Sequence, residues 1–246
     1  MTGSPRQAVE GFESISLDEL EEAAALQRRV DHKYLVSREQ FSRLADGLRR
    51  DHRVLEIDGE RVFAYESVYF DTDLLRCYAD HAAGRRPRFK ARSRLYQATG
   101  TCVFEVKLKR ADGETDKQHL DQQIEMHGTL TPQARDFLIA TLSDAGLDGG
   151  EFRPSLITSF VRATFGSGSA RATCDFRVHL SLPDGPATQL REDLCFVETK
   201  SEEGDSPADR LLAEIGAEPR SFSKYQTGIQ ALTKGGVDPD LSEALE

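Results

Sequence analysis

Residues 88–109, RFKARSRLYQATGTCVFEVKLK, carry the pattern that decides the fold. Side chains on a β-strand alternate between its two faces, so every second residue lies on the same side. In the first half of this stretch, one face collects four cations: Arg88, Lys90, Arg92 and Arg94. In the second half, apolar residues occupy one face and the other face holds Glu105, Lys107 and Lys109. The stretch therefore predicts two strands, each with an apolar face and an ionic face.

The same ionic alternation recurs in other segments that are predicted as strands. Their charged residues are Asp31 and Lys33, then Arg162, Arg171, Asp175 and Arg177, and finally Glu198 and Lys200. A charged strand face is usually the solvated side of a sheet. The recurrence favours a closed barrel instead, because a barrel turns such faces toward one axis. Unpaired charges inside it would be costly, and an anionic ligand with a metal would offset that cost.

The remaining segments mix strands and helices without a regular βαβ order. Runs rich in β-branched and aromatic residues, such as 61–70 and 193–200, predict further strands. Helices are predicted where a capping residue precedes an amphipathic run, as at Ser37 and at Thr131, which is followed by Pro132. The mixture predicts an α+β protein built on a mainly antiparallel sheet.

The net charge of −10 is concentrated at the two ends of the chain. Residues 1–27 carry six acids against Arg6, and residues 235–246 carry four acids, so the residues between them sum to only −1. Such charge-rich ends resist burial in a core. We therefore expect disordered acidic tails at 1–15 and 235–246, around a single domain that spans 16–234.

Several classes of protein are disfavoured by what the sequence lacks. No apolar run approaches the roughly 18 to 20 residues that span a bilayer, and the N-terminus has no basic start followed by an apolar stretch. We therefore expect a cytoplasmic protein without a membrane segment of its own. The cysteines form no CxxC pair, which argues against a zinc knuckle or a redox motif; they are Cys77, Cys102, Cys174 and Cys195.

The cations on the predicted strands suit phosphate as a ligand. Arginine donates two parallel hydrogen bonds to phosphate oxygens, and lysine acts as a point charge. The carboxylates among them admit two interpretations. Glu105 and Glu198 are either ion-pair partners of the cations or oxygen ligands for Mg²⁺ or Mn²⁺ that bridges to phosphate.

Eight strings in sequence order also resemble a known family. They are RVDHKYLV, VYFDT, KARSRLY, FEVKLK, RPSLITSFVRATF, ATCDF, FVETKS and FSKYQTG, and they lie between Arg28 and Gly228. As an ordered set they resemble the VTC (vacuolar transporter chaperone) polyphosphate polymerase domain, within the triphosphate tunnel metalloenzyme and CYTH-like superfamily. The resemblance implies an antiparallel eight-stranded β-barrel with surrounding helices. This triphosphate tunnel fold would hold triphosphate or polyphosphate together with a divalent metal, Mn²⁺ or Mg²⁺.

The resemblance also implies roles for individual residues. It places seven catalytic cations in the tunnel: Lys33, Arg92, Arg94, Lys107, Arg162, Arg171 and Lys224. It makes Glu198 the metal ligand, and Glu105 is a second candidate for that role. Residues expected to bind substrate are Lys117, Lys200 and two further members of the cationic strand face, Arg88 and Lys90.

Two positions depart from the family pattern near the expected site. Phe160 stands where the family often has tyrosine, two residues before Arg162, so a hydroxyl contact to phosphate would be missing. Ser221 stands where a basic residue is expected, although Arg220 lies next to it. These departures give some support to a non-catalytic module that binds polyphosphate or a nucleotide.

The first strand separates two enzymatic alternatives. It carries Arg29, Asp31 and Lys33 in place of the ExExK pattern of CYTH triphosphatases. The missing carboxylate favours polymerisation over hydrolysis, because a hydrolase needs a metal-held water. We therefore expect a nucleoside-triphosphate-dependent polyphosphate polymerase, with a metal-dependent triphosphatase as the alternative.

The expected partners follow from the same interpretation. They are a nucleoside triphosphate and polyphosphate, and export of the product would need a membrane-protein partner. A nucleic-acid module is disfavoured, because acids are interleaved with the cations and the isoelectric point is near 5.2.

Overall fold

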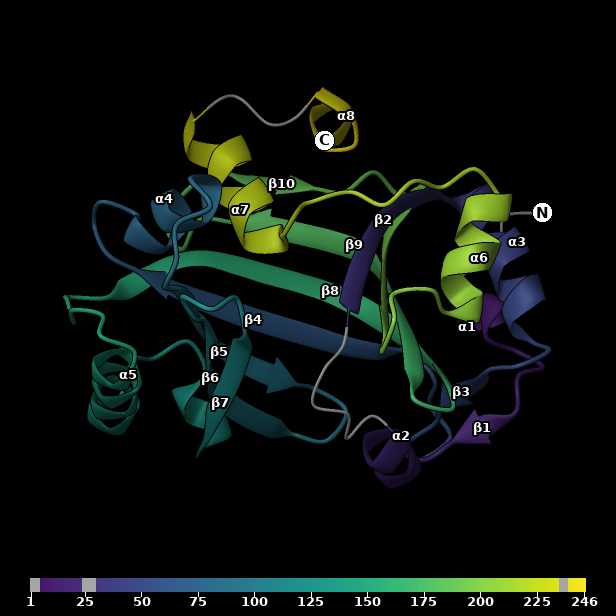
Figure 1. Cartoon of the computed structure of the whole chain (residues 1–246), viewed down its shortest axis with the longest axis horizontal. Coiled ribbons are helices and arrows are strands. Elements are labelled where there is room, and N and C mark those ends of the chain that lie inside the picture. The colour runs from purple at the N-terminus through teal and green to yellow at the C-terminus, as the bar shows by residue number, and fades with distance from the viewer. Residues whose placement is uncertain (1–4, 24–29, 235–238) are drawn as a thin grey trace.

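A computed structural model describes residues 5–23, 30–234 and 239–246 of the chain. Its centre is an 11-stranded sheet whose main path contains eight antiparallel strands (Figure 1). In spatial order they are β2 (Val30–Ser37), β11 (Leu194–Ser201), β9 (Ala170–Ser181), β8 (Arg153–Ser167), β4 (Phe63–Asp71), β5 (Arg88–Tyr96), β6 (Thr101–Lys109) and β7 (Thr115–Gln122). Three short strands pair at its margins: β1 (Ser14–Ile15), β3 (Arg53–Leu55) and β10 (Ala187–Gln189). The predicted α+β class and the eight antiparallel strands are confirmed.

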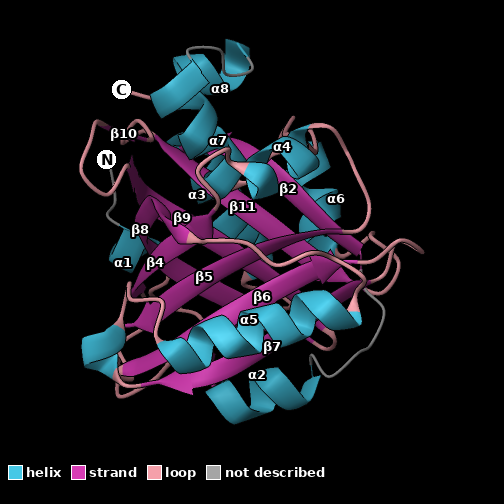
Figure 2. Cartoon of the chain, turned by 90° about the vertical axis from the view of Figure 1, so that its left-hand side faces the viewer, coloured by secondary structure: helices cyan, strands magenta, loops and turns pink. Residues whose placement is uncertain are grey.

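The main path is curved, with β2 and β11 on one side and β5, β6 and β7 on the other (Figure 2). The charge of Lys200 on β11 acts on Lys107 on β6, and that of Lys33 on β2 acts on Lys90 on β5. Pairing among the described strands nevertheless stops at β2 and β7, which are not bonded to each other. This main path, called the wall below, is therefore a strongly curved open sheet. The expected barrel is confirmed in its curvature, but the sheet of described strands does not close.

Helices cover the wall and fill its margins. They are α1 (Pro5–Ala8), α2 (Leu17–Ala23), α3 (Arg38–Leu48), α4 (Arg76–Ala82), α5 (Pro132–Asp144), α6 (Pro207–Glu214), α7 (Lys224–Ile229) and α8 (Pro239–Glu243), with a 3₁₀ turn at Ile124–Met126 and a π turn at Gln230–Lys234. The predicted caps are confirmed: Ser37 forms a capping box with Gln40, and the Thr131 side chain accepts from the Ala134 N–H. None of the described helices is long and apolar enough to cross a membrane.

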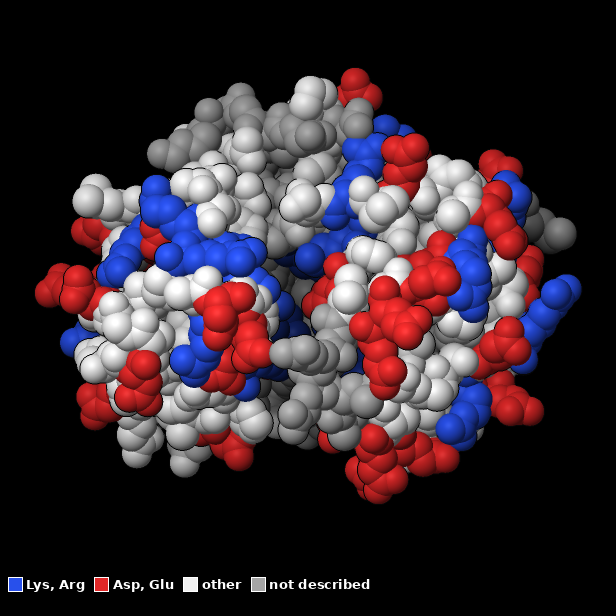
Figure 3. Space-filling view, in the orientation of Figure 1, with Lys and Arg blue, Asp and Glu red and all other residues white. Residues whose placement is uncertain are grey.

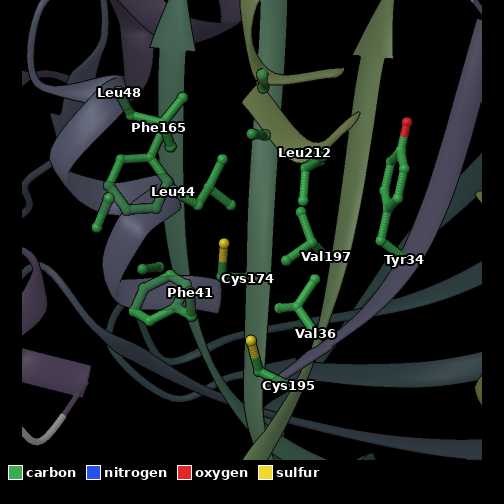
Figure 4. Packing of buried hydrophobic residues seen from close by; sticks show 14 of the residues in the cluster. Tyr34, Val36, Phe41, Leu44, Leu48, Phe165, Cys174, Cys195, Val197 and Leu212 are labelled. Atoms are coloured by element: carbon green, nitrogen blue, oxygen red, sulfur yellow. The ribbon is translucent and has the colours of Figure 1, made fainter. Parts of the chain in front are cut away.

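Two large apolar clusters lie mainly on the outer face of the wall, beneath helices; the second also reaches the inner face at Tyr69, whose hydroxyl accepts from Arg92. One packs α3 and α6 against β2, β11, β9 and β8, and includes Phe41, Leu44 and Val197 (Figure 4). The other includes Phe104 and Leu138 and packs α5 against β4, β5 and β6. Each fully buried side chain of this kind contributes about 1.5 to 3 kcal/mol. Because most of both clusters lies outside the wall, its inner face is left for polar residues along most of β5 and β6.

Described residues near both ends of the chain pack against this body. The ring of Phe12 lies 5.0 Å from that of Phe165, and both residues belong to the first apolar cluster. At the other end Ala244 is buried, and its carbonyl accepts from the Arg191 N–H. The described parts of 1–15 and 235–246 thus include residues that pack on the body, while the rest of those ranges lies outside the described residues. The division into tails and a domain at 16–234 stays a prediction. Within these acidic ranges, a few apolar residues such as Phe12 and Ala244 make the contacts with the body.

Candidate functional site

The inner face of the wall gathers the charged residues that the alternation predicted. On one side Arg92 lies opposite Glu105 in the β5–β6 register. On the other side Glu198 lies opposite Lys33 in the β11–β2 register. Figure 3 shows lysine and arginine side chains gathered around a hollow near the centre of the molecule. The curvature of the wall therefore brings charged residues from several strands into one shared cationic site.

The first group of charges in this site surrounds Glu105, whose side chain is 3 % exposed. Its Oε2 accepts from Arg92 Nε at 2.5 Å, Lys117 pairs with its other oxygen, and Arg94 Nε lies 4.0 Å away. Burial alone would raise the pKa of Glu105, but Arg92, Arg94 and Lys117 together hold that pKa well below its usual range. Since both oxygens already contact cations, the geometry favours the ion-pair interpretation of Glu105 over the metal-ligand one.

The second group surrounds Asp175, a residue 2 % exposed that the sequence placed on an ionic strand face but to which it gave no role in the site. Arg162 donates to both of its oxygens, from Nε at 2.6 Å and from Nη2 at 2.8 Å, and Lys224 forms a short ion pair with Oδ2. Burial opposes ionisation, but these two cations hold the pKa of Asp175 well below its usual range. The two-residue period puts Asp175 on the same strand face as Arg171, but the sequence gives no sign that Asp175 pairs with Lys224.

The start of α7 brings Lys224 into the site. The Ser223 side chain caps this helix by accepting from the Gln226 N–H. Just before it, the Arg220 N–H donates to the Lys33 carbonyl at 2.7 Å, and Lys90 Nζ donates to Ser223 Oγ at 3.0 Å. Residues 220–224 thus connect β2 to β5 across the open side of the wall.

Aromatic rings hold the cations of the second group. Phe160 and Tyr65 stack with their ring centroids 5.4 Å apart and their planes within 4°. The Arg162 guanidinium lies 5.3 Å from the Tyr65 centroid and 5.1 Å from that of Phe160, and Lys224 Nζ lies 4.7 Å from the latter. At this position a phenyl ring therefore orients cations by cation–π contact instead of offering a hydroxyl.

The third group contains Glu198. Lys200 Nζ lies 3.5 Å from Glu198 Oε1 and 4.0 Å from Asp31 Oδ2. Burial would raise the pKa of Glu198, but the charges of Lys200, Arg162 and Lys33 outweigh it and lower that pKa to about 2. Glu198 is therefore ionised at neutral pH, with a partly exposed side chain that faces the hollow.

The carboxylates of the site are too few to hold a hard divalent cation alone, and they fit such a cation only if phosphate oxygens also bind it. Within the described ranges, no group of three or more Asp, Glu, His or Cys residues is arranged to hold a metal. Magnesium commonly binds proteins through one or two carboxylates, with waters and substrate phosphates completing its shell. Glu198, with Asp31 two strand positions away across the β11–β2 pair, meets that requirement.

A group of cations lies where the inner face of β5 begins. It consists of Arg88, Lys90 and Lys107, with Lys33 facing them from β2. Burial, followed by repulsion from Lys107 and Lys33, lowers the pKa of Lys90 to about 7. This is the expected result of crowding like charges around a buried amine.

Two predicted members of the ionic faces lie at the margins. Arg171 reaches α2, where its Nη2 donates to the Leu20 carbonyl at 3.0 Å. Arg177 is exposed, which corrects its expected place on the ionic face. A register shift between Ser159 and Val161 marks a bulge in the β8–β9 pair, and Arg177 adopts a φ of 50° there. The extra residue reverses the alternation of β9 and turns Arg177 outward.

Comparison with known proteins agrees with this fold. A model of the VTC domain family matches residues 28–233. A protein from Hippeastrum, described as an adenylyl cyclase with a dominant triphosphatase activity, has a similar fold with a TM-score of 0.54 and 18% identity, over 86% of this chain and 98% of that one. A protein from Bacillus halodurans assigned as an adenylate cyclase has a TM-score of 0.51 and 17% identity, over 80% of this chain and 94% of that one.

A search of curated proteins gave no match. The family match covers most of the chain, including all three groups of charges on the inner face. The chain therefore belongs to the VTC domain family.

Proposed function

We propose that this chain is a nucleoside-triphosphate-dependent polyphosphate polymerase. The observation that carries the proposal is the convergence of Arg92, Arg162 and Lys224 with Glu198 on the inner face of one curved wall. Membership of the VTC domain family supports it, since polyphosphate synthesis is the activity that the sequence resemblance implies.

The reaction needs positioning and charge neutralisation more than covalent help from the protein. A terminal oxygen of the polyphosphate chain attacks the γ-phosphorus of the nucleotide and forms a new P–O–P bond. The bond from the γ-phosphorus to the bridging oxygen breaks, and the nucleoside diphosphate leaves with that electron pair. Arg92, Arg94 and Arg162 hold the phosphates in line, and Lys33 and Lys224 neutralise charge on the attacking and leaving oxygens.

A divalent metal, when bound, would neutralise charge on the transferred phosphoryl group. Glu198 is the carboxylate of this chain that would hold it, because the Glu198 side chain is ionised and faces the hollow. Glu105 has a different role in this proposal: it keeps Arg92 and Lys117 fixed in place through ion pairs.

The alternative enzyme is a triphosphatase, in which water replaces polyphosphate as the acceptor. This alternative is supported by the fold shared with the Hippeastrum protein, whose description names a dominant triphosphatase activity. The two activities use the same anion site and differ in product, which is long chains for the polymerase and free phosphate for the triphosphatase.

The deciding experiment incubates the purified chain with ATP and Mn²⁺, stains a gel for polyphosphate and measures free phosphate. We expect long chains. Glu198→Gln should lower the rate by about 100-fold or more while the protein remains folded, a loss comparable to removing one charge-stabilising group. The matched control is Glu202→Gln, which removes an exposed carboxylate just after β11 and should retain full activity.

Each contrary result has a distinct meaning. Free phosphate without chains identifies the triphosphatase. Tight nucleotide binding without either product identifies a binding module. Full activity in Glu198→Gln refutes the metal role of that residue.

A further inference from the structure

The cations along the inner face of β5 become more exposed toward the start of the strand. The Arg94 side chain is 10 % exposed and that of Arg92 is 22 % exposed. Arg88 is half-buried, and Arg86, just before the strand, is exposed. The gradient shows that the Arg88 end of β5 is a mouth where the cationic site opens to solvent.

Charge compensation also changes along this line. In the interior, Arg92 is paired with Glu105, and Arg162 is paired with Asp175. At the mouth, the contacts are to neutral oxygens: Arg88 Nη1 donates to the Arg85 carbonyl at 3.0 Å, and Lys90 donates to the Ser223 hydroxyl. The mouth is therefore rich in positive charge that the protein does not neutralise by these contacts.

The surrounding elements add to this positive charge. Lys107 on β6 and Lys33 on β2 both act on Lys90, and the charges of Lys90 and Arg88 act in turn on His81 of α4. Burial, and then the charge of Arg86, lower the pKa of Arg88. Like charges held together in this way favour a bound anion, which relieves their repulsion.

The far end of β5 has a different chemistry. Tyr96 packs edge-on against Tyr65 with ring centroids 5.2 Å apart, and Tyr65 stacks on Phe160. Phe196 and Phe222 are also in contact, at 4.5 Å between centroids, and Lys224 Nζ lies 5.4 Å from the Phe196 centroid. The cation over the tyrosine rings, Arg94, lies 5.8 Å from the Tyr65 centroid and is only 10 % exposed, so among the described residues this end lacks the exposed cations of the Arg88 end and the two ends of the site are not equivalent.

We propose that a linear polyphosphate extends out of the site at the Arg88 end, passing Lys90 and Arg88 and continuing over Arg86. The mouth is then the binding surface for the part of the chain that lies beyond the reacting phosphates. This assignment rests on the proposed function only in taking polyphosphate as the anion, and it adds the direction in which the polymer lies.

The test compares two ligands on one variant. Arg86→Gln/Arg88→Gln removes two charges at the mouth, and binding of inorganic tripolyphosphate is measured beside binding of long-chain polyphosphate. We expect the dissociation constant for the long chain to rise about fivefold to tenfold more than that for tripolyphosphate, because exposed ion pairs are individually weak. The control, Arg43→Gln/Arg135→Gln, removes two exposed arginines from α3 and α5 and should leave both constants unchanged.

The outcomes separate this assignment from the proposed function. An equal effect on both ligands, or no effect on either, overturns the direction assigned here. If the unaltered protein binds neither ligand, the proposed function fails as well. If it binds tripolyphosphate and only the long-chain preference is absent, the proposed function stands and the mouth assignment is wrong.

Discussion

Replacing Asp175 with asparagine tests how the site balances its charge. The substitution keeps the shape of the side chain but removes the negative charge that holds Arg162 and Lys224 together. Both cations would then lose the carboxylate that contacts them directly, while the charge of Glu198 still acts on them. We expect the protein to lose stability in the absence of a ligand, and to regain much of it when a phosphate-rich anion binds.

The magnitude follows from the burial of the group. Breaking a buried ion pair by removing one partner typically costs about 3 to 5 kcal/mol. The side chains of Arg162 and Lys224 are each 16 % exposed, so they retain some contact with water, and the lower value of about 3 kcal/mol applies. For a chain of this size, that loss lowers the melting temperature by about 6 to 12 °C.

The assay is thermal or urea unfolding with and without tripolyphosphate. At 100 times its dissociation constant a ligand adds about 2.7 kcal/mol, and Asp175→Asn should gain more than the unaltered protein at the same concentration because its site is more positive. Asp136→Asn, an exposed carboxylate on α5, is the control and should stay within about 0.5 kcal/mol. An Asp175→Asn protein with unchanged stability and no extra gain from the anion would refute the counterion role.

Two further substitutions probe the structure around the site. The folded pKa of Lys90 is about 7, below its ordinary 10.5, so between these values the unfolded chain holds a proton that the folded chain has lost, and the stability contribution of Lys90 rises with pH. Lys90→Met should therefore be more stable than the unaltered protein at pH 7 and below, with a difference that shrinks toward pH 10 in melting curves; a pH-independent difference contradicts this. Tyr225→Phe removes the buried hydroxyl that donates to Asp71, and urea unfolding should show a loss of about 1.5 kcal/mol; no loss would mean that this hydrogen bond adds nothing to stability.

Local alternation predicted the inner face well where the strands are regular. The residues on the ionic faces of β5 and β6, such as Arg92 and Glu105, lie on the inner face because the two-residue period is a property of the strand itself. The cap at Ser37 was predictable for the same reason, since its partner Gln40 is three residues away. These features depend on neighbours in sequence.

The features that were missed depend on neighbours in space. The contact between Asp175 and Lys224 joins a strand to a helix 49 residues later. The outward turn of Arg177 results from a bulge that no composition rule marks. Closure of the wall was also beyond local patterns, because it depends on whether β2 and β7 meet at bonding distance.

Because most of the two large apolar clusters lies outside the wall, the residues that stabilise the fold are largely separate from those that would bind the anion. Phe41 and Leu138 stabilise the protein from beneath its helices, where no phosphate reaches them. Substitutions on the inner face that keep its net charge unchanged should therefore leave the fold stable. Substitutions confined to the inner face can therefore change which anion the protein binds, without altering the apolar clusters that stabilise its fold.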